Sequence, residues 1–80
     1  MSFKVYILES KKFEKYYIGS TKDLEKRLEF HNSSRARWTK RYQPWVLKYY
    51  EEFGDRTDAV KRERFLKSLK NTKRFLGSVG

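Results

Sequence analysis

Three types of side chain in this sequence could act together in the hydrolysis of a phosphodiester. Tyrosines occur in two short apolar runs near the N-terminus, VYIL at residues 5–8 and YYIGST at residues 16–21. Arg27 follows the second run, and one acidic residue, Glu63, comes much later. An arginine can hold a phosphate through two parallel hydrogen bonds, and a carboxylate can bind a hard divalent cation. A tyrosine can accept or relay the proton of an attacking water where positive charge lowers its pKa.

Each of these residues also has an ordinary structural explanation. Tyrosines on strands are most often core residues with a satisfied hydroxyl group, and an arginine beside a core often covers apolar surface with its methylene groups. Glu63 precedes Lys67 by four residues, so the two can form an ion pair on a helix. A single carboxylate makes a metal site only when water and substrate phosphate complete the coordination shell. The residues alone leave both interpretations of Glu63 open.

The elements that must position these side chains follow from local patterns. Two N-terminal segments are β-branched and aromatic, with a short polar connection between them, which predicts an antiparallel hairpin. A third apolar segment lies between a proline and a glycine, as a strand would. The predicted strands are residues 3–9, residues 16–20 and Trp45–Phe53.

Helices are predicted where capping residues precede apolar residues at helical spacing. The first runs from a cap at residues 21–23 to Asn32, the second from about Asp58 to Leu69, and a short last helix passes through Arg74–Leu76. Residues 33–43 are polar and basic, and we predict a surface loop there. The order β-β-α-β-α-α predicts an α+β fold, with a three-stranded antiparallel or mixed sheet flanked by helices in a single domain over residues 1–80.

Helical spacing places the candidate residues at the border of the predicted core. Leu24 and Leu28 lie on the apolar stripe of the first helix, and Arg27 and His31 lie beside it, one turn apart. On the second helix, Glu63 shares a side with Ala59 and Leu66. A lone histidine at such a position is more often hydrogen-bonded structure than a catalyst, so His31 is a candidate only.

The composition points to an anionic partner. The chain has 20 lysines and arginines against 10 acidic residues, a formal charge of +10, and nucleic acid is the first candidate. A membrane surface is the alternative, but it normally requires an apolar helix face with aromatic anchors, and excess lysine can also serve solubility alone. There is no cysteine, which excludes disulfides and thiolate zinc sites. No apolar run approaches the roughly 20 residues of a membrane span, and we expect a cytoplasmic protein, nucleoid-associated if bacterial.

The basic segment is the expected contact with nucleic acid. Its cations would bind phosphates, and Trp38 or Tyr42 would stack an unpaired base. Gly19 lacks a side chain where a substrate backbone can approach. The cations are Arg35, Arg37, Lys40 and Arg41.

Five segments in this order resemble the GIY-YIG nuclease family. They are VYIL, YYIGST, LEKRLEFHN, a basic loop that ends in Pro44-Trp45, and AVKRERFLKSLK. The resemblance covers about residues 3–76. It is closest to the small stand-alone bacterial members, and the sequence is also similar to the nuclease subunit of the eukaryotic enzyme that cuts branched DNA.

The resemblance implies a role for each candidate residue. Tyr6 and Tyr17 match the tyrosines of the two family motifs, and Gly19 matches the glycine of the second. The family arginine that neutralises the scissile phosphate corresponds to Arg27, and His31 falls where a histidine or tyrosine helps proton transfer. Glu63 matches the single metal-binding glutamate. The register with the glycine favours Tyr17 over Tyr16 as the general base.

The resemblance implies hydrolysis of DNA by an activated water and one divalent cation, Mg²⁺ or Mn²⁺. We therefore expect a structure-selective endonuclease of low sequence specificity that acts in repair or recombination. Lys4 and Val5 replace the glycine and isoleucine of the first motif, and Ser20 stands where repair-type members carry a lysine. Two alternatives stay open, a non-catalytic nucleic-acid-binding module and a nuclease subunit that is silent without a protein partner.

Overall fold

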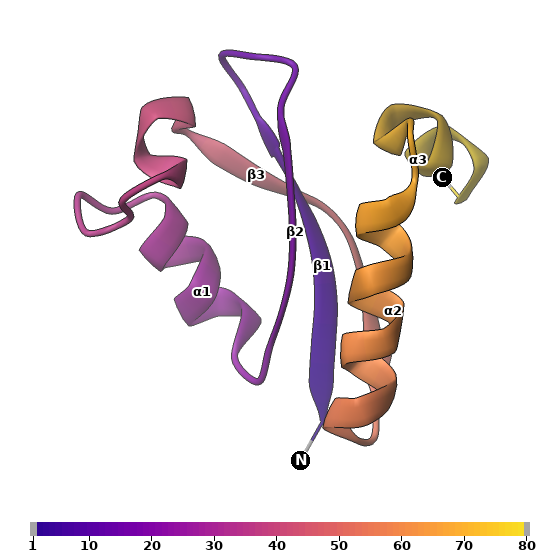
Figure 1. Ribbon diagram of the computed structural model, residues 1–80. Coiled ribbons are helices and arrows are strands. Elements are labelled where there is room, and N and C mark those ends of the chain that lie inside the picture. Colours follow the sequence, from indigo (N-terminus) through magenta and orange to yellow (C-terminus); the bar gives the residue numbers. More distant parts are fainter. Residues whose placement is uncertain (1, 80) are drawn as a thin grey trace.

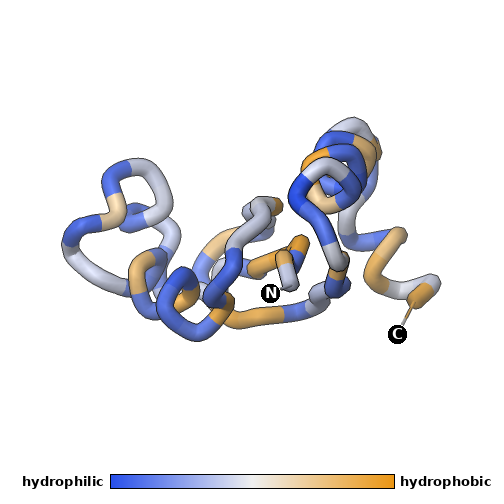
Figure 2. Tube along the Cα trace, turned by 90° about the horizontal axis from the view of Figure 1, so that it is seen from below, coloured by the Kyte–Doolittle hydropathy of each residue, from blue (hydrophilic) through white to orange (hydrophobic). Residues whose placement is uncertain are grey.

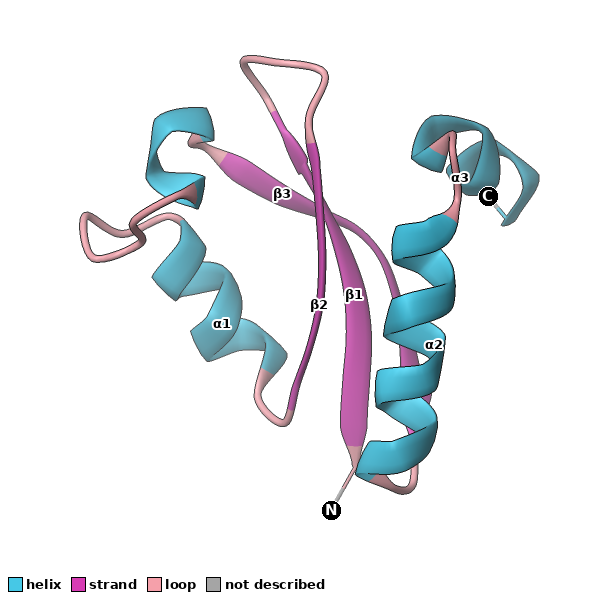
Figure 3. Cartoon of the chain, in the orientation of Figure 1, coloured by secondary structure: helices cyan, strands magenta, loops and turns pink. Residues whose placement is uncertain are grey.

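A three-stranded sheet separates the helices into two groups (Figure 1). The computed structural model describes residues 2–79. The strands are β1 (Phe3–Ser10), β2 (Tyr16–Thr21) and β3 (Trp45–Phe53). The helices are α1 (Leu24–His31), α2 (Arg56–Ser68), α3 (Thr72–Val79) and a short 3₁₀ helix, η1 (Thr39–Tyr42). The predicted α+β class and the predicted order of elements are confirmed (Figure 3).

The sheet is antiparallel throughout, with strand order β2-β1-β3. β1 is therefore the central strand, and its residues 5–8 are all buried. Side chains alternate between the two faces of a strand. Val5 and Ile7 accordingly pack against Ala59 and Leu66 of α2, whereas Tyr6 and Leu8 pack with Trp45 on the opposite face.

Each face of the sheet carries its own small hydrophobic core. Figure 2 shows the hydrophobic strand segments in the middle of the molecule, with hydrophilic segments around them. On the α2 side, partly buried residues complete the core: Phe3, Tyr16, Ile18, Tyr49, Phe53, Leu69, Phe75 and Leu76. On the α1 side the corresponding residues are Tyr17, Leu24, Leu28, Tyr42 and Leu47.

Among residues 2–79, no helix is both long enough and apolar enough to cross a membrane.

Side-chain caps set the start of the two C-terminal helices. The Asp55 carboxylate accepts a hydrogen bond from the amide of Asp58 at 2.9 Å, so α2 begins two residues before the predicted start. The Asn71 side chain accepts from the amide of Arg74 at 2.9 Å. The predicted short last helix through Arg74–Leu76 is confirmed, but α3 is longer, because it starts directly after this cap and continues through Gly77.

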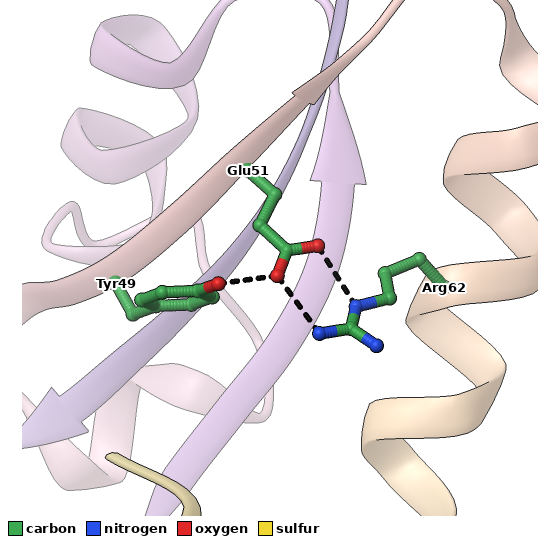
Figure 4. Close-up of polar contacts among 3 residues, drawn as sticks. All are labelled: Tyr49, Glu51 and Arg62. Atoms are coloured by element: carbon green, nitrogen blue, oxygen red, sulfur yellow. Dashed lines mark hydrogen bonds and ion pairs between the residues drawn. The ribbon is translucent and has the colours of Figure 1, made fainter. Parts of the chain in front are cut away.

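An ion pair joins α2 to β3 (Figure 4). The Arg62 guanidinium donates to both carboxylate oxygens of Glu51, at 2.8 and 2.9 Å, and the Tyr49 hydroxyl donates to the same carboxylate. The guanidinium also lies over the ring of Phe75, 5.8 Å from its centroid. Arg62 thus ties α2 to the sheet and to α3, and it directly precedes Glu63 in the chain.

The segment between α1 and β3 is more ordered than the predicted surface loop. It contains η1, and Ala36 and Thr39 are buried. The Asn32 side chain pairs with both backbone groups of Trp45, at 2.6 and 3.0 Å. The Gln43 amide donates to the carbonyl groups of His31 and Ser33, at 3.0 and 2.7 Å. The side-chain amides of Asn32 and Gln43 therefore hold the two ends of this segment together. The polar composition of the segment does not predict these contacts.

Candidate active site

The first cluster of candidate residues lies on the face of the sheet next to α1. Strand register places Tyr6 opposite Gly19 and Leu8 opposite Tyr17. The two tyrosine rings share this face, with centroids 6.2 Å apart. A Cβ atom on Gly19 would lie only 2.7 Å from the Tyr6 hydroxyl oxygen. Gly19 is buried, so the missing side chain makes room for Tyr6 within the protein.

His31 connects the two tyrosines to the segment before β3. Its Nε2 atom lies 3.2 Å from the Tyr6 hydroxyl oxygen, and its Nδ1 atom lies 3.0 Å from Oγ1 of Thr39. Its ring centroid is 4.4 Å from that of Tyr17. Burial and the charge of Arg27 lower the pKa of His31 to about 4. The imidazole is therefore neutral at physiological pH, with one nitrogen donating and the other accepting.

The buried hydroxyl of Tyr6 keeps its proton at neutral pH. Burial raises its pKa, the neighbouring Tyr17 raises it further, and the charge of Arg27 compensates only in part. The sequence-based expectation that positive charge lowers the pKa of a strand tyrosine is therefore wrong for Tyr6. Tyr6 can donate or accept a hydrogen bond but is unsuited to act as a general base. Tyr17, which is only partly buried, is left as the tyrosine that an attacking water can reach.

Arg27 lies at the edge of the sheet, beside the end of β2. Its side chain is exposed, and the guanidinium lies 5.7 Å from the centroid of the Phe30 ring. It lines a hollow of about 310 Å³ together with two more cations, Lys22 and Arg56. The same hollow is lined by Ser20. Three cations around one hollow attract an anion such as a phosphate.

Glu63 lies on the other face of the sheet, and two donors hold its carboxylate. The Ser20 hydroxyl donates to Oε1 at 2.7 Å, and the Lys67 ammonium lies 2.7 Å from Oε2. Burial raises the pKa of Glu63, but its hydrogen bonds with Lys67 and Ser20 outweigh this effect and the pKa is lowered overall. Glu63 is therefore ionised at neutral pH. The ion pair that the i,i+4 spacing predicted is present.

The donor set at Glu63 fits a hard cation. Within residues 2–79, no three His, Cys, Asp or Glu side chains gather as a metal site. Mg²⁺ usually keeps several waters and binds through one or two carboxylates together with substrate phosphates. Glu63 offers one partly buried, ionised carboxylate of this kind, and a cation bound to Oε2 would take the place of the Lys67 ammonium. The closed nitrogen and sulfur site of structural zinc is absent from residues 2–79.

Strand β2 brings the two clusters together. Tyr6, Tyr17 and His31 lie on its α1 side, while its Ser20 side chain reaches Glu63 on the α2 side. The charges of Arg27 and Glu63 both act on the pKa of Tyr6, so the clusters lie within electrostatic reach of each other. From the sequence, Ser20 is notable only because it stands where repair-type members carry a lysine, and Thr39 is not a candidate. The contact of Ser20 is with Glu63, 43 residues away. The contact of Thr39 is with His31, eight residues away across an irregular segment.

The predicted nucleic-acid-binding residues of the basic segment divide into two groups. Arg35, Arg37 and Trp38 line a second hollow of about 320 Å³, which Tyr17 and His31 also line. The remaining two, Lys40 and Arg41, lie on η1 and are exposed. The Arg41 guanidinium lies 6.0 Å from the centroid of the Tyr42 ring. The structure therefore places only part of the basic segment directly beside the tyrosine cluster.

Comparison with known proteins agrees with this arrangement. The sequence profile of the GIY-YIG catalytic domain matches residues 2–75. A UPF0213 protein of Clostridium perfringens is 41% identical over 66 residues, which are 81% of this chain and 70% of that protein. A UPF0213 protein of Staphylococcus saprophyticus is 37% identical over 89% of this chain and 87% of its own length.

A solved structure shows the same fold. The solution NMR structure of a UPF0213 protein from Bacillus halodurans superimposes with a TM-score of 0.60 and is 32% identical, over 99% of this chain and 85% of that one. A Bacillus cereus relative is 44% identical over 68% of this chain, but the match spans only 57% of that protein. The chain belongs to the GIY-YIG family of nuclease domains.

Proposed function

We propose that this protein is an endonuclease that hydrolyses phosphodiester bonds of DNA with the help of one divalent cation, Mg²⁺ or Mn²⁺. One observation carries the proposal. Ser20 lines the cation-rich hollow of Arg27 and also donates to the carboxylate of Glu63. A phosphate bound in this hollow would lie beside both the arginine and the carboxylate.

Each side chain contributes to hydrolysis in a distinct way. Arg27 binds a non-bridging oxygen of the scissile phosphate and stabilises the charge that develops on it. Glu63 holds the cation, which when bound supplies further stabilisation of that charge. Tyr17 takes or relays the proton of the attacking water. His31 stays neutral and, with Tyr6, fixes the position of the tyrosine cluster.

We further propose that the enzyme selects its substrate by structure and has low sequence specificity. The exposed cations of residues 33–43 are suited to phosphates, and phosphate contacts carry no direct sequence information. An activity of this kind serves DNA repair or recombination.

A cleavage assay over a panel of labelled substrates tests this function. The panel contains flaps, forks, four-way junctions, single strands and intact duplex, each with Mg²⁺, Mn²⁺ or a chelator. We expect at least one substrate to be cut only when metal is present, and we expect Glu63→Ala to abolish this cleavage. Glu29→Ala, which removes an exposed acid from α1, is the matched control and should cut like the original protein.

Two outcomes would overturn the proposal. The first is that the pure protein leaves every substrate uncut with either metal, including after the addition of host extract, while binding DNA tightly. That result would assign the chain to the non-catalytic binding modules. The second is that Glu63→Ala cuts as fast as the original protein.

A further inference from the structure

An exposed tryptophan lies beside the tyrosine cluster. The side chain of Trp38 is 54% exposed, although tryptophans are usually largely buried. It lines the hollow of about 320 Å³ together with Tyr17, Phe30 and His31. This volume is at the lower end of the range of small-molecule sites. An aromatic ring that faces such a hollow offers a flat surface on which another ring can stack.

Trp38 lies close to the tyrosine cluster. Its ring centroid lies 6.3 Å from that of Tyr17 and 5.2 Å from that of Tyr42. The next residue, Thr39, is buried, and its hydroxyl contacts His31. The Thr39 carbonyl accepts a hydrogen bond from the Trp45 indole at 2.8 Å. Trp38 is therefore attached to a segment that is anchored at two points.

The charges around this hollow are positive. Arg35 and Arg37 line it, both side chains are exposed, and none of the acidic residues within 2–79 contributes to its lining. A nucleotide combines an aromatic base with a negatively charged phosphate. Stacking on an aromatic side chain and arginine contacts to phosphate are the two interactions by which proteins bind single strands. The chemistry of the hollow matches both parts of a nucleotide.

We propose that this hollow is a subsite for one unpaired base, which stacks on Trp38 while Arg35 and Arg37 hold the phosphates on either side of it. The inference rests on the proposed function and names its substrate class, DNA with at least one unpaired nucleotide near the cleaved bond. A base inside an intact duplex has both faces covered by its neighbours, so it reaches Trp38 only when it is single-stranded or flipped out. Intact duplex is then bound through its phosphates alone.

Binding without cleavage tests the subsite directly. A labelled single-stranded oligothymidylate is titrated in the presence of a chelator, and its affinity is measured by fluorescence anisotropy. Trp38→Ala should weaken binding about tenfold, and Trp38→Phe should recover most of the loss because it keeps an aromatic face. Phe65→Ala is the matched control, since Phe65 is 50% exposed but lies on α2, and it should bind like the original protein.

An oligonucleotide with the same length and charge but with abasic sites separates stacking from phosphate binding. It should bind the original protein and Trp38→Ala with equal affinity. The chain has two tryptophans, and Trp45 is 2% exposed. Quenching of the intrinsic fluorescence by oligothymidylate therefore reports mainly on Trp38, and the abasic strand should quench much less.

The subsite would be refuted if Trp38→Ala bound oligothymidylate as tightly as the original protein. It would also be refuted if this variant lost equal affinity for the abasic strand. Because the chelator prevents cleavage, these results do not depend on nuclease activity. A protein that stacks a base on Trp38 but cuts nothing would refute the proposed function and leave the subsite standing.

Discussion

The space beside Tyr6 is filled so closely that a methyl group on Gly19 would collide with the tyrosine ring. A Cβ atom on Gly19 would lie 2.7 Å from the hydroxyl oxygen and 3.0 Å from Cζ of this buried ring, and 3.2 Å from Cε1 of Tyr17. Real Cβ atoms essentially never lie as close as 2.7 Å to another heavy atom, and Tyr6 is 2% exposed and has little room to move. The glycine of the family motif therefore has a packing role in this protein.

We predict that Gly19→Ala lowers the free energy of unfolding by about 1–3 kcal/mol, the usual cost of overpacking a core. Urea denaturation measures this loss. Gly54→Ala is the matched control, because a Cβ atom there meets no atom of the described residues within 4 Å. Equal stability of the two variants would show that the Tyr6 ring can move aside.

The neutral state of His31 makes the stability of the fold depend on pH. Its pKa falls from 6.5 to about 4 on folding, because burial and Arg27 disfavour the charged form. The unfolded chain therefore binds this proton more readily than the folded chain. The stabilisation is present above pH 6.5 and is lost as the pH falls from 6.5 towards 4.

We predict that this loss is on the order of 3 kcal/mol across that window. Urea denaturation at a series of pH values measures it. His31→Gln carries no proton that titrates in this range, so its stability should fall less steeply between pH 6.5 and 4. Parallel slopes for the two proteins would contradict the assignment of a lowered pKa to His31.

At this scale the sequence specifies the candidate residues but not their environments. The motif spacing and helical periodicity select Tyr6, Tyr17, Arg27 and Glu63. The raised pKa of Tyr6 follows from burial between two strands and a helix, which no local pattern reports. The contact of Ser20 with Glu63 spans 43 residues and depends on the packing of α2 against β2.

At the scale of the elements, α2 must be held in place for Glu63 to reach Ser20. Arg62 precedes Glu63 and donates to both carboxylate oxygens of Glu51 on β3. Successive residues of a helix point in different directions. Arg62 therefore faces β3 while Glu63 faces β2, and together they fix the rotation of α2 about its axis.

We predict that Arg62→Ala lowers the free energy of unfolding by about 2 kcal/mol, because it removes charge-assisted hydrogen bonds that are only partly exposed. The Arg62→Ala variant should also cleave DNA more slowly, although Arg62 has no direct role in the proposed hydrolysis. Chemical denaturation and the cleavage assay check the two effects. Lys61 is an exposed neighbour on α2, and Lys61→Ala should change neither the free energy of unfolding nor the rate of cleavage. If Lys61→Ala and Arg62→Ala responded alike, Arg62 would have no specific role in positioning α2.

The elements that local patterns specify were predicted well. The strands alternate between two buried faces and are rich in β-branched and aromatic residues, and their order and type are confirmed. The segment 33–43 was predicted as an open loop because its residues are polar. Its order comes from Asn32 and Gln43, whose amides bind backbone groups 10 to 13 residues away. Such contacts have no periodic signature.

At the scale of the whole molecule, the charge of +10 favours binding of a polyanion such as nucleic acid. Binding of a single strand weakens with salt with a slope of about −0.7 for each neutralised phosphate. Four cations of the basic segment are exposed. They are Arg35, Arg37, Lys40 and Arg41.

If each of these four cations contacts one phosphate, raising the salt fourfold, from 50 to 200 mM, should weaken binding of oligothymidylate about 50-fold. Anisotropy titrations at several salt concentrations measure the slope. Arg35→Ala should reduce its magnitude by about 0.7. A slope that stays unchanged in this variant would remove Arg35 from the interface.

The central claim is that Tyr17, Arg27 and Glu63 form one hydrolytic site across the edge strand β2. The single-turnover rate constant for metal-dependent cleavage of a forked DNA tests it most directly, in variants that unfold at the same urea concentration as the original protein. We predict a loss of about 100-fold or more for Tyr17→Phe, Arg27→Ala and Glu63→Gln, and no loss for the control Glu29→Ala. If Tyr17→Phe, Arg27→Ala or Glu63→Gln is folded and still cuts as fast as the original protein, the claim is contradicted.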